Sequence, residues 1–161
     1  MKRATLLLSL AGVLALLAAG CGGGGGERLS KAEFITAADA VCTKYDKQGD
    51  EIDFPDVDLD KNPSDADLDT FGDALEQIGD IFDEQIDELD ALNPPEADQE
   101  LFDEALDHLR DASGKIKEAA GSAHDNDVAA VKKSLSEGET SSDAADKIGQ
   151  QYGFKVCGAD N

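Results

Sequence analysis

The strongest structural signal in this sequence lies at residues 64–92, which read SDADLDTFGDALEQIGDIFDEQIDELDAL. Large apolar residues recur there at intervals of three and four, at Leu68, Phe71, Leu75, Ile78, Phe82, Ile86 and Leu89. This spacing places them on one face of a helix about 40 Å long. Asn93-Pro94-Pro95 then ends the helix, because proline cannot continue it. The chain therefore contains a long amphipathic helix whose apolar stripe must be buried.

Another helix is predicted upstream, beginning at Ser30. The tetrapeptide Ser30-Lys31-Ala32-Glu33 has the pattern of a capping box, in which the serine and glutamate side chains satisfy backbone N–H groups of the first turn. The apolar positions that follow are Phe34, Ala38, Val41, Cys42 and Tyr45. Their spacing places Cys42 on the buried face, and we expect the helix to end near Asp50.

Two more helices are predicted after the proline pair. Pro95 suits the first turn of one of them, and Gly121 is expected to end it. Its apolar face consists of Leu101, Phe102, Ala105, Leu106, Leu109, Ile116 and Ala119. Asp125 or Asn126 then caps the last helix, and Gly153 suits its C-terminal cap.

Four amphipathic helices, with no segment typical of a strand, predict an all-α fold. Short connections between the last three favour an antiparallel up-down four-helix bundle over residues 30–161. An acidic loop at residues 50–64, which contains Pro55 and offers little apolar surface, separates the first helix from the others. Gly138 leaves open whether the last helix is continuous.

The first twenty residues have the pattern of a secretory signal peptide. Lys2 and Arg3 precede an apolar run at residues 6–19, as in the n-region and h-region of such signals. The run is short for a membrane span, which needs about 20 apolar residues. We therefore expect residues 1–20 to be removed after export.

Residues Leu17-Ala18-Ala19-Gly20-Cys21 resemble the lipobox of bacterial lipoproteins, although Ala18 stands where that family most often has Leu. The resemblance implies cleavage before Cys21 and attachment of acyl chains such as palmitate to that cysteine. Residues 21–29, with their glycine run, would form a tether to the extracytoplasmic face of the cell membrane. The alternative is an ordinary secretory signal cut after Ala19 or Gly20.

The other two cysteines, Cys42 and Cys157, are predicted to form a disulfide, because an even number of thiols is usually paired in an oxidising compartment. In an up-down bundle the last helix ends near the start of the first, and Gly153 can reverse the chain toward it. The alternative is a pair of buried free thiols.

The mature chain also resembles a group of small lipoproteins of high-GC Gram-positive bacteria. The shared features are an opening like Phe34-Ile35-Thr36-Ala37-Ala38-Asp39-Ala40-Val41-Cys42, a Leu92-Asn93-Pro94-Pro95 break, and a closing aromatic residue, glycine and Cys157-Gly158. The resemblance implies the helical fold, the disulfide and the anchor. It implies no chemistry, because the shared motifs are structural.

The chain is strongly acidic, with 36 Asp and Glu against 14 Lys and Arg and a net charge of −22. Proteins bind nucleic acids by neutralising phosphates with Lys and Arg, so a nucleic-acid partner is excluded. The same charge favours a soluble monomer that is repelled by anionic lipid headgroups.

The sharpest candidate metal site lies in the acidic loop, where Asp56, Asp58 and Asp60 take the first three ligand positions of an EF-hand type calcium loop. The match fails at Lys61, which stands at the glycine position, and at Asp67, which replaces the bidentate glutamate. The alternative is a solvated linker that condenses divalent cations loosely. His108 and His124 are each interpreted as isolated surface histidines, with His124 in a loop.

No arrangement of residues typical of an enzyme or of a cofactor site occurs in the sequence. The function predicted is therefore that of a non-catalytic, membrane-anchored interaction or accessory module, whose acidic surface meets a basic envelope protein or divalent cations. The alternative is a divalent-cation or small-ligand binding protein that uses the acidic loop or a cavity between helices.

Overall fold

The computed structural model describes residues 28–158 of the chain. The predicted signal peptide, the predicted lipidation site at Cys21 and the glycine run lie outside the described residues. Within 28–158 no helix is both long enough and apolar enough to cross a membrane.

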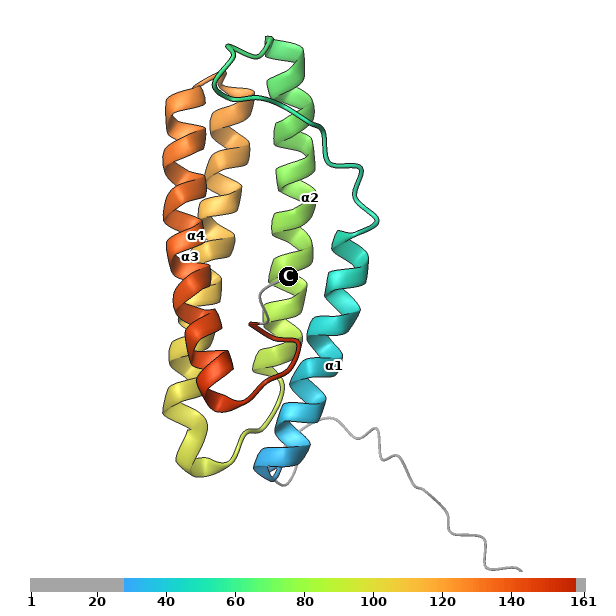
Figure 1. The fold of residues 1–161 in the computed structure, drawn as a ribbon, viewed down its shortest axis with the longest axis vertical. Coiled ribbons are helices and arrows are strands. Elements are labelled where there is room, and N and C mark those ends of the chain that lie inside the picture. Colours follow the sequence, from blue (N-terminus) through green and yellow to red (C-terminus); the bar gives the residue numbers. More distant parts are fainter. Residues whose placement is uncertain (1–27, 159–161) are drawn as a thin grey trace, which may run out of the picture.

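The described chain is all-α and contains no strand. Its elements are α1 (Lys31–Gly49), α2 (Asp65–Asp90), the short 3-10 helix η1 (Glu96–Asp98), α3 (Gln99–His124) and α4 (Val128–Tyr152). Successive helices run in opposite directions, as Figure 1 shows. The predicted antiparallel up-down four-helix bundle is therefore confirmed.

Helices α1 and α2 each begin with a capping box. The Ser30 side chain accepts a hydrogen bond from the backbone N–H of Glu33. The Glu33 carboxylate in turn accepts a hydrogen bond from the backbone N–H of Ser30 at 3.0 Å. Ser64 and Asp67 form the same arrangement at the start of α2. Asp67, which the calcium-loop pattern uses as a ligand, is thus occupied by a helix cap, and the hydrogen bonds from Ser64 lower the pKa of its carboxyl.

Two apolar clusters fill the bundle, one above the other. The lower core surrounds Phe34, whose ring makes an edge contact with Phe102 at 4.8 Å between centroids and another with Tyr152 at 5.9 Å. The upper core consists of Phe71, Leu75, Ala119, Ala120, Ala123 and Val131. The helices meet closely in the upper core because most of its α3 residues are alanines.

The acidic loop at residues 50–64 covers the upper core, which the sequence pattern did not indicate. Helix α1 has 19 residues against 26 in α2, so it leaves the upper part of the bundle uncovered. Val57 and Leu59 pack on the upper core, and the ring of Phe54 lies 5.2 Å from that of Phe71. The loop therefore covers the upper part of the bundle that α1 is too short to reach, as Figure 1 shows.

The prediction that Gly121 ends the third helix is wrong. Helix α3 continues to His124, because Ala123 is fully buried in the upper core and the next turn is needed to place it there. Asn126 takes the left-handed conformation (φ 59°) that reverses the chain, and Asp127 caps α4 by accepting from Ala130 N. Helix α4 is continuous through Gly138.

Residues 28 and 29, which were assigned to the tether, already belong to the folded domain. The Arg28 guanidinium donates to the carbonyl of Pro94 at 3.0 Å and to the side chain of Gln99 at 2.9 Å. The backbone N–H of Leu29 donates to the carbonyl of Asn93 at 2.9 Å. These two residues therefore belong to the helical domain and not to the predicted tether.

The segment after α4 returns along α1, as predicted. Gly153 ends α4 in the left-handed conformation (φ 108°). The Asp39 carboxylate on α1 then accepts hydrogen bonds from three successive backbone N–H groups, those of Lys155, Val156 and Cys157, at 2.9–3.2 Å. This places Cys157 beside Cys42, and the predicted disulfide between them is present.

Candidate functional site

A pocket of about 200 Å³ lies in the middle of the bundle, beside the disulfide. All four helices and the segment after α4 contribute to it. Its lining residues are Ala38, Cys42, Asp46, Phe82, Gln85, Leu89, Phe102, Ala105, Leu109, Ser142, Ala145, Asp146, Gly149, Phe154, Val156, Cys157 and Gly158.

The pocket exists because small residues face one another where a bundle usually has large ones. Ala38 on α1, Ala105 on α3, and Ala145 and Gly149 on α4 all line it. Among the described residues, the backbone of α1 packs against that of α2 and does not pack against that of α4. The segment 154–158 occupies the space between α1 and α4, as the red end of the ribbon in Figure 1 shows.

Gly149 allows this segment to come close to α4. A Cβ atom on Gly149 would lie 3.1 Å from the carbonyl oxygen of Cys157 and 3.4 Å from the ring of Phe154. Together with the Cys42–Cys157 disulfide, this contact fixes one wall of the pocket. The wall is attached to α1 twice, covalently through Cys42 and by the Asp39 hydrogen bonds.

The pocket has an apolar interior and polar groups among its lining. Phe82, Leu89, Phe102 and Leu109 supply the apolar surface, whereas Asp46, Gln85, Ser142 and Asp146 supply the polar groups. Burial and the neighbouring Asp50 carboxylate raise the pKa of the Asp46 carboxyl. This arrangement suits a small molecule with an apolar body and an end that donates hydrogen bonds or carries positive charge.

The volume is large enough for a ligand. A cavity of roughly 150 Å³ lined by aliphatic and aromatic side chains can hold a benzene molecule. The other described pocket, beside Phe34 and Tyr152, has only about 10 Å³. The pocket beside the disulfide is therefore the better candidate for a binding site.

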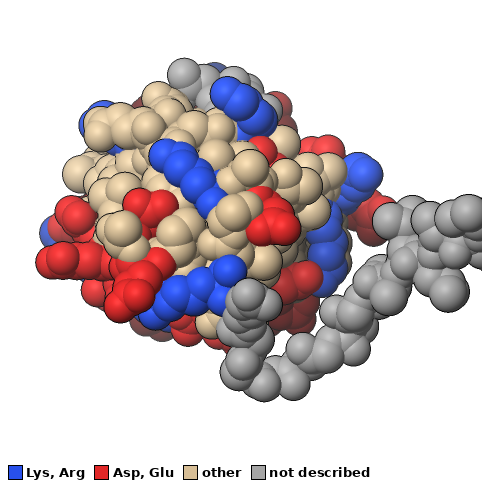
Figure 2. Space-filling view, turned by 90° about the horizontal axis from the view of Figure 1, so that it is seen from below, with Lys and Arg blue, Asp and Glu red and all other residues tan. Residues whose placement is uncertain are grey.

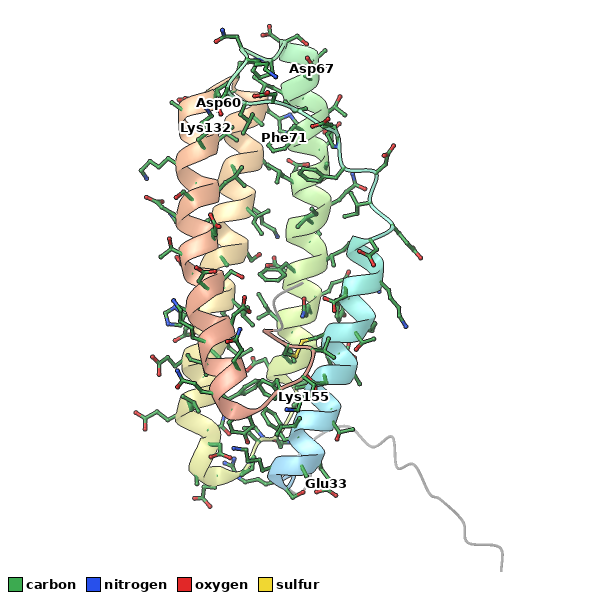
Figure 3. The ribbon with its side chains drawn as sticks, viewed as in Figure 1. Glu33, Asp60, Asp67, Phe71, Lys132 and Lys155 are labelled. Carbon is green, nitrogen blue, oxygen red and sulfur yellow. A yellow bond between two sulfur atoms is a disulfide. The ribbon has the colours of Figure 1, made fainter. Side chains whose placement is uncertain are left out.

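The three aspartates predicted to bind calcium lie on the surface of the loop. Asp58 pairs with Lys61 at 2.8 Å and accepts from the backbone N–H of Asp60, and these contacts lower the pKa of its carboxyl. Asp60 pairs with Lys132 of α4, as Figure 3 shows at the upper end of the bundle. Asp56 is exposed. A calcium ion here would have to displace two lysines, and its binding stays a prediction.

The sequence did not indicate which residues form the pocket. Ala145 and Gly149 are one turn apart on α4, and such small residues are usually interpreted as close helix contacts. The available signal was the lack of a large apolar residue at these two positions of an otherwise amphipathic helix. The position of His124 was also missed, since it ends α3 and lies against α2.

Comparison with known protein families, with curated proteins and with solved structures finds no match to this chain.

Proposed function

We propose that this protein is a lipid-anchored, non-catalytic binding protein of the outer face of the cell membrane, which holds a small amphipathic molecule in the pocket beside the disulfide. The pocket is the observation that carries this proposal. The lipobox-like residues before Cys21 support the anchor. The polar lining favours a ligand with an amine or another hydrogen-bond donor at one end.

The geometry of the bundle fits attachment through its lower end. Arg28 lies only seven residues after Cys21, so a lipid on Cys21 would keep this end within about 25 Å of the membrane. Figure 2, which views the bundle from below, shows much uncharged surface with several Lys and Arg side chains among the acidic ones. This end is therefore suited to approach a membrane despite the acidity of the whole chain.

The pocket favours binding over catalysis. Among the described residues that line it there is no histidine or lysine, and both of its cysteines are in the disulfide. Ser142 therefore has no histidine or lysine in the lining that could activate it as a nucleophile.

Filling the pocket should abolish binding. We expect indole, used as a probe, to shift the NMR signals of Ala105, Leu109 and Gly149, which line the pocket in the wild-type protein. The substitution Ala145→Leu adds three carbons inside the pocket and should remove these shifts. Ala129→Leu, at an exposed position on the same helix, is the matched control and should leave them intact. The proposal is wrong if indole gives no localised shifts, or if Ala145→Leu preserves them.

A second candidate function is the docking of a basic envelope partner. Helix α2 supports it, because its 26 residues contain no Lys or Arg and carry acidic residues along their whole length. Such docking should weaken as salt is added, since exposed charges are screened within about 10 Å at 0.1 M. Pull-downs from the native envelope at low and high ionic strength test this, and a partner retained equally at both would contradict it.

A further inference from the structure

A histidine and three carboxylates meet at the upper end of the bundle, on the side of α2 and α3. His124 is the last residue of α3, and its side chain is one-third exposed. Its Nε2 lies 3.8 Å from a carboxylate oxygen of Asp73 and 3.7 Å from one of Glu76. Its Nδ1 lies 3.6 Å from Asp69 on the opposite side of the ring.

The His124 ring packs directly against the backbone of α2 at Gly72. A Cβ atom on Gly72 would lie 2.8 Å from both Cε1 and Nε2 of the His124 ring, so no larger residue fits beneath it. Asp69, Asp73 and Glu76 follow one another at intervals of four and three residues on α2. This spacing places their carboxylates on the helix face that also carries Gly72. The imidazole thus rests on the backbone of α2 with carboxylates around it.

The distances fit metal coordination better than hydrogen bonding. The separations from Nε2 to the Asp73 and Glu76 oxygens are longer than an N–H···O hydrogen bond, which is usually 2.7–3.2 Å. Two ligand atoms bound at about 2.1 Å to one tetrahedral ion lie about 3.4 Å apart. The ligand atoms of His124, Asp73 and Glu76 all lie within 4.8 Å of one another. A small inward movement of exposed side chains would bring them to a common ion.

We propose that His124 Nε2, Asp73 and Glu76 bind one zinc ion. Imidazole nitrogen combined with carboxylate oxygen suits Zn²⁺, whereas calcium prefers oxygen ligands alone. Asp69 acts as a positioning residue. Its carboxylate lies 3.6 Å from Nδ1, and a small side-chain movement would let it accept a hydrogen bond from Nδ1–H, which fixes the tautomer that leaves Nε2 free to coordinate. The exposed side of the site leaves the fourth position for water or for a ligand atom from a partner.

The zinc site is separate from the pocket beside the disulfide and does not depend on the proposed function. It lies where α2 begins and α3 ends, at the end of the bundle opposite the start of α1, as Figure 1 shows. The ion would connect α2 to the end of α3.

The test is titration of the mature, oxidised protein with zinc chloride, followed by calorimetry and by NMR of the histidine ring nitrogens. We expect one zinc ion per chain with micromolar affinity, and an Nε2 signal of His124 that shifts while Nδ1 stays protonated. His124→Gln should lower the affinity at least tenfold. His108→Gln, on the same helix, is the matched control and should leave it unchanged.

Two further variants test the packing of the ring on Gly72 and the role of Asp69 as a positioning residue. Gly72→Ala should weaken zinc binding by displacing the ring, and Asp69→Asn should weaken it about tenfold. The proposal is overturned if His124→Gln binds zinc as well as the wild type, which would indicate diffuse binding to acidic groups. It is also overturned if zinc leaves the His124 nitrogens unchanged, which would indicate only an ion-paired histidine.

Discussion

Removal of the Cys42–Cys157 disulfide is expected to lower the free energy of unfolding by about 4 kcal/mol. The bridge joins residues 115 apart in the sequence, so it removes much conformational freedom from the unfolded chain. It also holds the segment after α4 against α1, whose backbone comes close to that of α2 alone among the other described helices. The double substitution Cys42→Ala/Cys157→Ala should therefore loosen the wall of the pocket as well.

Urea unfolding of the oxidised protein and of the double variant measures this effect. The reduced and alkylated wild-type protein provides a second comparison and should unfold near the same urea concentration as the variant. A loss below about 1 kcal/mol would show that the Asp39 hydrogen bonds and the apolar contacts of Phe154 hold the segment without the bridge.

Phe34→Ala is expected to cost about 4 kcal/mol of stability, because it leaves a large cavity in the lower core. The Phe34 side chain is only 1% exposed, and its ring contacts those of Phe102, Tyr152 and Phe154 at centroid distances of 4.8–5.9 Å. These contacts join α1 to α3, to α4 and to the returning segment. Loss of the ring therefore affects α1, α3, α4 and the returning segment, all of which line the pocket.

Phe54→Ala is the matched control for this substitution. Phe54 is 43% exposed and contacts the Phe71 ring from the loop, so the same change of side chain should cost about 1 kcal/mol or less. Thermal unfolding of both variants at equal protein concentration gives the comparison. Equal losses from the two substitutions would contradict the assignment of Phe34 to the centre of the core.

The helices could be predicted because their apolar residues repeat with the period of a helix. Ser30 and Gly153 marked two helix ends correctly, since each supplies a specific cap. Gly121 misled the prediction because the burial of Ala123 outweighs the cost of a glycine in a helix. The packing of Val57 on the upper core could not be anticipated, since it depends on how far α1 reaches along the bundle.

The candidate sites were harder to predict from the sequence than the fold was. The disulfide was predicted from the expected export, the number of cysteines and the topology, and the structure confirms the disulfide. The pocket depends on small residues from three helices that are brought together only by packing. The contact between His124 and Glu76 joins positions almost fifty residues apart, and no local pattern relates them.

The proposal as a whole is tested most directly by the native mass of the protein purified from its own membrane. We expect a chain that begins at a lipidated Cys21 and carries one small non-covalent ligand, which the Ala145→Leu variant purified in the same way lacks. A chain without lipid that carries no such ligand would contradict the proposal that this bundle is a membrane-anchored binding protein.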